Sequence, residues 1–118
     1  MPNPLHITVV YIAVVRNFIY WVYNKYMQIE YDPEKRSITS KERGLDFARA
    51  TEVFQGIHFT AQDVRFQYQE DRFITAGWLD ARLVVLVWTP RGEARRIISM
   101  RKGNDREKAL YARHLERS

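Results

Sequence analysis

Cysteine is absent from this chain of 118 residues, and histidine is scarce. Without thiols the chain has no disulfide, no thiolate metal site and no cysteine nucleophile, as suits a reducing compartment such as the cytoplasm. The three histidines, His6, His58 and His114, are too scattered to suggest a metal site, and neither HExxH nor EF-hand spacing occurs. We therefore expect a cytoplasmic protein that works without a metal or another cofactor.

Acidic residues are also missing from the N-terminal part of the chain, where none precedes Glu30. Residues 5–23 are almost wholly apolar, and this length is close to the ~20 residues that cross a bilayer. Arg16 lies near the centre of this stretch, where a charge costs roughly 2.5 to 3.5 kcal/mol on the insertion scale. A spanning helix is therefore disfavoured, although a membrane-anchored protein stays open as an alternative.

A signal peptide fits the same segment badly, because no basic residue precedes the apolar run and no small-residue cleavage site follows it. Met27, in contrast, is followed at once by a self-contained pattern of strand and helix. We interpret residues 1–26 as an extension from an upstream mis-start and residues 27–118 as the domain. A chain that starts at Met27 is expected to have no membrane contact.

The chain is 46% hydrophobic, and its length and composition are those of one globular domain. Its net charge of +5 is carried by the C-terminal segment. An anionic partner, either nucleic acid or an acidic protein, is one interpretation, and a solvated surface is the other. From residue 91 onward nine basic residues, Arg91, Arg95, Arg96, Arg101, Lys102, Arg106, Lys108, Arg113 and Arg117, stand against four acids, Glu93, Asp105, Glu107 and Glu116.

Helix signals are clear in the first half of the domain. Residues 28–31 are predicted as a short strand, Asp32 is an N-cap residue and Pro33 suits the first helical position. This helix should end near Arg43, with Gly44 as its stop. A second helix, capped by Asp46 and ended by Gln55 and Gly56, should place four residues on one face, namely Phe47, Ala50, Val53 and Phe54.

The second half of the domain predicts four strands, at residues 57–61, 72–79, 83–88 and 94–101. Residues 83–88 form a continuous apolar run, which is typical of a strand buried on both faces and indicates a central position. Residues 79–82 are a turn, and residues 89–92 are predicted as a hairpin turn that uses Gly92.

A last helix should start at a capping box of Asn104 and Glu107 and reach about Leu115. Four residues are expected on its inner face, namely Leu110, Tyr111, His114 and Leu115. The predicted fold class is therefore α+β, with a small antiparallel sheet, two N-terminal helices and one C-terminal helix.

Several motifs, taken in order, resemble the BrnT toxin family. They are Tyr31-Asp32-Pro33-Glu34-Lys35, then residues 43–47 with Ala50, then residues 68–74 with Gly77, and finally residues 96–101 followed by Glu107 and Tyr111. Together they cover essentially all of residues 28–112. The family has no counterpart to residues 1–26.

The resemblance implies a RelE-like fold and an endoribonuclease of a type II toxin-antitoxin pair, whose cleavage of RNA blocks translation. It also implies neutralisation by a BrnA-like, DNA-binding antitoxin, so that operator DNA is contacted only through that partner. A rival hypothesis is a basic module that binds nucleic acid or an acidic partner without cleaving it.

Cleavage of RNA without a metal uses the 2'-hydroxyl as nucleophile, so charge that develops on phosphorus must be neutralised. Arginine suits this task because its planar fork binds phosphate oxygens in a bidentate way. Arg72, Arg96 and Arg101 lie at motif positions on strands that we expect to be neighbours. They are the first candidates, and the alternative is that their stems cover apolar edges.

Other candidates have weaker support. Glu70 is a candidate base, although orienting Arg72 is the favoured role. RNA contacts are expected from Lys35, Ser99, Lys102 and Tyr111, each of which has a structural alternative: Lys35 as a solvated charge, Ser99 as a small packed residue and Tyr111 as part of the helix face. His58 has the unperturbed pKa of a general base, near 6.5, but a structural role is favoured.

Overall fold

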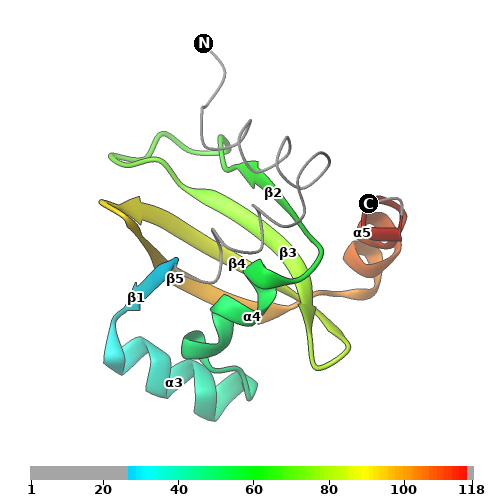
Figure 1. Ribbon diagram of the computed structural model, residues 1–118, viewed down its shortest axis with the longest axis horizontal. Helices are drawn as coiled ribbons and strands as arrows, with labels where there is room; N and C mark the ends of the chain where they lie inside the picture. Colours follow the sequence, from blue (N-terminus) through cyan, green and yellow to red (C-terminus); the bar gives the residue numbers. More distant parts are fainter. Residues whose placement is uncertain (1–26, 117–118) are drawn as a thin grey trace.

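Five strands form one mixed sheet in the computed structural model, which describes residues 27–116 (Figure 1). The interpretation of residues 1–26 concerns a segment outside the described residues. In chain order the elements are β1 (Gln28–Tyr31), α3 (Pro33–Arg43), the 3-10 turn η1 (Phe47–Arg49), α4 (Ala50–Gln55), β2 (His58–Gln62), β3 (Phe73–Leu79), β4 (Arg82–Arg91), β5 (Ala94–Lys102) and α5 (Asp105–Glu116).

The strand order is β1-β5-β4-β3-β2, which confirms the α+β class and the central position of β4. The expectation of a purely antiparallel sheet was wrong, because β1 pairs with β5 in parallel while the other three pairings are antiparallel. The next elements after β1 are α3, η1 and α4, so no hairpin turn fixes the direction of β1.

Helix ends follow the side-chain chemistry that the sequence predicts. The carboxylate of Asp32 accepts a bond from the amide of Glu34 at 2.9 Å, and Pro33 begins α3. Gly44 ends α3 in the left-handed region at φ 67°, which costs glycine nothing because it has no Cβ. Asp46 caps the following segment, which starts as a 3-10 turn before α4.

Two details of the second half differ from expectation. The hairpin turn between β4 and β5 is shorter than predicted, because β4 continues to Arg91 and only Gly92 and Glu93 turn. In α5 the capping box of Asn104 and Glu107 is confirmed, with bonds of 2.8 and 3.0 Å. Leu110 was wrongly expected on the inner face of α5, since it is 54% exposed.

The hydrophobic core lies between the sheet and α4 with η1. Phe73 and Trp88 stack with ring centroids 4.9 Å apart, and Phe54 of α4 meets Trp88 edge-on at 5.7 Å. Gly77 of β3 allows α4 this close, because a Cβ there would lie 2.8 Å from a side-chain carbon of Val53. We call the sheet surface toward α4 the core face.

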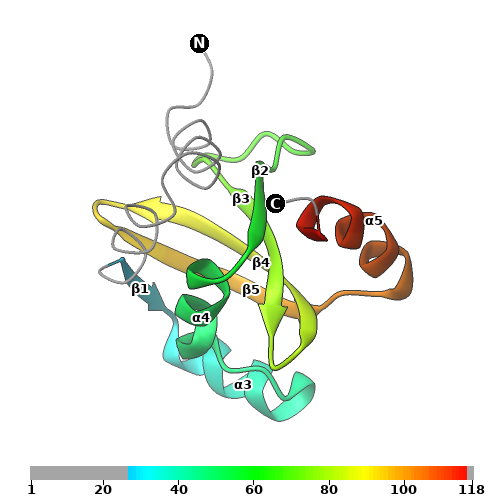
Figure 2. The same cartoon turned by 45° about the vertical axis from the view of Figure 1, so that its right-hand side comes forward.

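The opposite surface of the sheet is here called the open face, and among the described helices it is α5 that packs against it, at one end (Figure 2). Tyr111 of α5 packs there against Ala76 and Leu83. Within the described part of the chain, no helix combines the length and hydropathy that crossing a bilayer requires.

Candidate active site

A β-bulge in β5 places the candidate residues of this strand on one face. Regular strands alternate their side chains, so Arg96 and Arg101, five positions apart, would normally point to opposite faces. The register shifts between Val87 and Trp88, so that Trp88 pairs with Ile97 and Val87 with Ser99. The bulged residue changes the phase, and three predicted residues, Arg96, Ser99 and Arg101, therefore share the open face.

Arg72 and Arg96 belong to one row across the open face. Thr89 of β4 pairs with Arg96 of β5, and Trp88 pairs with Phe73, the residue after Arg72. Arg72 and Arg96 are thus separated by one strand, with a Cα spacing of about 10 Å. Their side chains are 31% and 35% exposed, so each guanidinium is anchored by packing yet open to solvent.

The guanidinium of Arg72 is held mainly by contact with the ring of Tyr68, and its ion pair with Glu70 is long. Its central carbon lies 4.2 Å from the ring centroid of Tyr68, within the range of a cation-π contact. The nearest carboxylate, that of Glu70, is 3.9 Å away and is closer to Arg91, at 3.2 Å. The Nε atom of Arg72 is buried and has no hydrogen-bond partner among the described residues.

Two hydrogen bonds to main-chain carbonyls, one at Asp71 and one at Arg72, fix the backbone position of Arg72. The hydroxyl of Thr89 donates to the carbonyl of Asp71 at 2.6 Å. The amide of Asp63 donates to the carbonyl of Arg72 at 2.7 Å, which closes the base of the connection between β2 and β3. Thr89 is almost completely buried, so this anchor is shielded from water.

Arg96 has a long contact with an acid of the neighbouring edge strand. Its guanidinium lies 3.5 Å from the carboxylate of Glu30 in β1, which it faces in the parallel register. A partly exposed pair at this distance is a weak interaction. An anionic ligand can therefore take the place of Glu30 at little cost.

Arg101 has a different setting, because it forms a bidentate ion pair with Glu107 of α5. The two bonds measure 2.7 and 2.8 Å. Hydrogen bonding from Arg101 lowers the pKa of Glu107 to about 2, against the opposing effect of burial. The pair fastens the start of α5 to the end of β5.

The structure separates Arg101 from the row of Arg72 and Arg96. Five positions of β5 correspond to about 16 Å along the strand, and the Arg101 guanidinium is paired with Glu107. Arg65, in the loop between β2 and β3, is near enough for its charge to lower the pKa of Arg101, although hydrogen bonding to Glu107 leaves that pKa raised. Arg101 therefore marks a second basic position on the open face.

The four residues predicted to contact RNA come from three different elements, β5, α3 and α5. Ser99 is half-buried on β5 between the two basic positions. Lys102 is exposed at the end of β5, and Lys35 is exposed in the first turn of α3. Tyr111 of α5 is half-buried against the sheet, with its ring 6.1 Å from that of Phe59.

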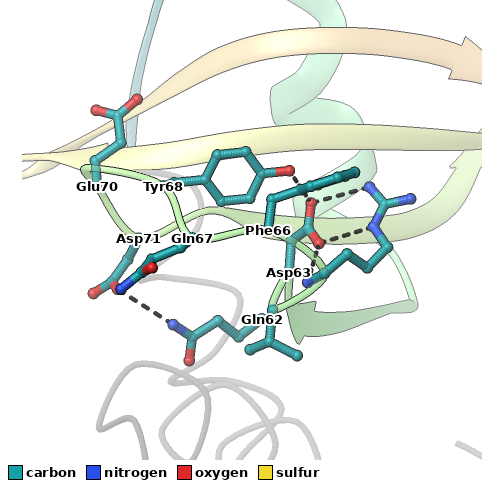
Figure 3. Close-up of a pocket in the computed structure, with 9 residues that line it drawn as sticks. Gln62, Asp63, Phe66, Gln67, Tyr68, Glu70 and Asp71 are labelled. Atoms are coloured by element: carbon teal, nitrogen blue, oxygen red, sulfur yellow. Dashed lines mark hydrogen bonds and ion pairs between the residues drawn. The ribbon is translucent and has the colours of Figure 1, made fainter.

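The connection of residues 63–72 forms a groove that the sequence analysis did not identify (Figure 3). Its volume is about 350 Å³, and the buried carboxylate of Asp63 is part of its lining. Arg65 binds this carboxylate through two nitrogens at 2.9 and 3.0 Å, and the hydroxyl of Tyr68 donates to it at 3.0 Å. The hydrogen bonds from Arg65 hold the pKa of Asp63 far below its ordinary range.

A family model for "Ribonuclease toxin, BrnT, of type II toxin-antitoxin system" matches residues 31–107, well over half of the chain. The chain belongs to the BrnT family. No curated protein sequence matches the chain significantly. The matched segment contains Arg65, Arg72, Arg91, Arg96 and Arg101, and it ends within the first turn of α5, before Tyr111.

His58 of this BrnT protein lies away from the arginine row. It is on the edge strand β2, and its Nδ1 is 2.8 Å from the carbonyl of Gly56. Burial lowers the pKa of His58 to about 4, so its ring is neutral at pH 7. His58 pairs with Gly77 and therefore lies on the core face, and a structural role for it remains the prediction from the sequence.

The arginine row of this BrnT protein fits the needs of phosphoryl chemistry. Two guanidiniums about two strand spacings apart can contact neighbouring oxygens of a phosphodiester, with Thr89 behind them. Among the described residues, no three His, Cys, Asp or Glu side chains gather in a way that would hold a metal ion. The two arginines themselves offer stabilisation of negative charge.

Proposed function

We propose that this BrnT protein is an endoribonuclease that cleaves RNA without a metal, with the 2'-hydroxyl as the attacking group. The single observation that supports this most is the row of Arg72, Thr89 and Arg96 on the open face. Both guanidiniums are anchored, partly exposed and only loosely paired with carboxylates. Such donors stabilise charge that develops on phosphorus in the transition state.

The proposed roles follow the geometry of each residue. Arg72 and Arg96 hold the reacting phosphate, and Glu70 orients Arg72 instead of acting as the base, because it lies between two guanidiniums. Arg101 contacts a neighbouring phosphate while Glu107 holds it in place. Further contacts to the RNA strand come from Ser99, Lys102, Tyr111 and Lys35.

The biological consequence of cleavage is proposed from the family. A ribonuclease toxin of a type II system has an antitoxin partner. We propose that RNA cleavage inhibits translation in the cytoplasm, that the fold is RelE-like, and that a BrnA-like antitoxin covers the basic surface. Operator DNA is then reached only through the antitoxin.

Incubation of the purified protein with RNA in excess EDTA tests the proposal. Cleavage in EDTA, with 2',3'-cyclic phosphate or 3'-phosphate ends, supports the endoribonuclease. Binding of RNA without cleavage would support the rival hypothesis, a non-catalytic basic module. If EDTA abolishes cleavage, the protein is a ribonuclease but its chemistry depends on a metal ion, which contradicts the proposed mechanism.

A further inference from the structure

Phe66, beside the arginine row, is an exposed aromatic side chain on a well-anchored loop. Its side chain is 66% exposed, and it belongs to the groove of residues 62–71. Val64 on the same loop is 78% exposed, so the loop presents more than one apolar side chain to solvent, and exposed apolar patches often mark binding surfaces. The groove volume of about 350 Å³ lies within the range of sites for small ligands.

Hydrogen bonds hold the loop in one conformation. The carboxylate of Asp63 accepts bonds from the amide and the guanidinium of Arg65 and from Tyr68. The side chain of Gln62 donates to Asp71 at 3.2 Å across the groove (Figure 3). Phe66 is therefore presented in a preorganised position, which lowers the entropic cost of binding a ligand.

The loop carries cations and aromatic rings together. The Arg65 guanidinium lies 5.9 Å from the Phe66 ring, and Tyr68 meets the same ring edge-on, also at 5.9 Å. Tyr68 in turn stacks on Arg72. The aromatic surface is thus continuous with the guanidinium that is proposed to hold the reacting phosphate.

We propose that Phe66 stacks an unpaired nucleobase of the RNA next to the cleaved phosphate, with Arg65 at its side. This inference deepens the proposed function and rests on it. Single-stranded nucleic acids are bound by the same combination of cations along the backbone and aromatic rings beneath the bases. Charge complementarity supports RNA as the occupant, since the Arg65 guanidinium lies over the Phe66 ring and Arg72 lies over the neighbouring Tyr68 ring.

The proposal also assigns a role to the carboxamides and carboxylates of the groove. Gln67 and Asp71 lie on the groove wall and offer donors and acceptors to the edge of a stacked base. Stacking alone tolerates any base, so these side chains would set the preference for one base over another. Phe66 supplies affinity, and the groove wall supplies selectivity.

Binding of single-stranded oligonucleotides with 2'-O-methyl groups tests the proposal without cleavage. Fluorescence anisotropy with the full chain should show that Phe66→Ala weakens binding by about five- to a hundred-fold, the range for losing one stacked base. Phe66→Trp should retain binding. Ile38→Ala is the control, because Ile38 is an exposed apolar side chain, 47% exposed, on α3 outside the groove.

An abasic scan makes the test specific for a base. Removing single bases from the oligonucleotide should weaken binding to the wild type most strongly at one position. Removal of the base at that position should weaken binding to the Phe66→Ala variant only slightly, because the missing base and the missing ring belong to the same contact. Additive losses at every position would overturn the proposal, as would wild-type affinity of Phe66→Ala.

Two further outcomes separate this inference from its alternatives. If Phe66→Ala weakens binding of the antitoxin but leaves RNA binding unchanged, the loop is a protein-docking surface and the proposal is wrong. If the effects of the abasic position and of Phe66→Ala are not additive but the wild type cleaves no RNA, the base site is supported and the endoribonuclease activity is refuted. Cleavage by Phe66→Ala at the wild-type positions with wild-type KM contradicts the base site alone.

Discussion

Arg72 and Arg96 flank Thr89 on the open face of the sheet, with one strand between them. They come from segments that are distant in the sequence, and only strand pairing brings them together. Each has a carboxylate nearby, but the contacts of 3.9 and 3.5 Å are long. The row therefore combines fixed position with accessible charge, which is what stabilisation of a phosphorane requires.

Thr89 should act as a positioning residue for Arg72. Thr89→Val removes the hydroxyl that bonds to the carbonyl of Asp71, and we expect a loss of about 1 kcal/mol in the free energy of unfolding. Because the anchor of Arg72 is then loosened, kcat should fall more than KM rises. Thr89→Ser keeps the hydroxyl and should restore kcat, whereas a Thr89→Val variant with wild-type kcat would refute this role.

The ion pair between Arg101 and Glu107 should make stability depend on pH in the acidic range. The pKa of Glu107 falls from its ordinary value near 4.5 to about 2 in the folded protein. A lowered carboxyl pKa stabilises the fold above the unfolded value, and this contribution is lost as the pH falls from about 4.5 to 2.

Glu107→Gln should therefore lower the free energy of unfolding by about 1 kcal/mol at pH 7, since it loses a charged partner and weakens the helix cap. Urea titrations at pH 7 and pH 3 measure the effect. The difference between wild type and variant should shrink at the lower pH. A difference that is equal at both values would show that the ion pair contributes nothing.

His58 should influence stability but not catalysis. Its folded pKa of about 4 lies below the ordinary 6.5, because burial disfavours the charged ring. The unfolded chain thus binds a proton first as the pH falls, and stability should decrease between about pH 6.5 and 4. His58→Gln should reduce this decrease and retain most RNA cleavage. A folded His58→Gln variant without cleavage would instead make His58 the base.

Association with the antitoxin should be steered by the C-terminal basic segment. The association rate should fall as the salt concentration rises, by roughly ten-fold between low and physiological ionic strength. The double variant Lys102→Gln, Arg106→Gln should weaken this dependence, because both side chains are exposed in that segment. The control is Lys35→Gln, Lys41→Gln on α3, and equal effects of the two double variants would argue against local steering.

Local chemistry made several elements predictable from the sequence. The caps at Asp32, Asp46 and Asn104 were correct because each cap depends on one side chain and the next three residues. The apolar run in β4 predicted a central strand because both faces of that strand are covered. The turn after β4 was predicted too early, since the sequence Thr89-Pro90 resembles a turn yet continues the strand.

Features that depend on distant pairing were not predictable from the sequence. The parallel pairing of β1 with β5 is a tertiary contact without a local signal. The bulge near Ile98 depends on the partner strand, and without it Arg101 would not share a face with Arg96. The bonds that enclose Asp63 link residues of a polar loop, so the sequence offered no reason to single out Arg65 or Phe66.

Single-turnover cleavage of RNA by Arg→Lys variants tests the central claim most directly. Arg72→Lys and Arg96→Lys keep the charge but lose the fork, and each should slow cleavage by on the order of ten- to a thousand-fold with unchanged folding. Arg82→Lys, at the opposite end of β4, is the control and should cleave at the wild-type rate. If the folded Arg72→Lys and Arg96→Lys proteins also cleave at the wild-type rate, the arginine row is not the active site.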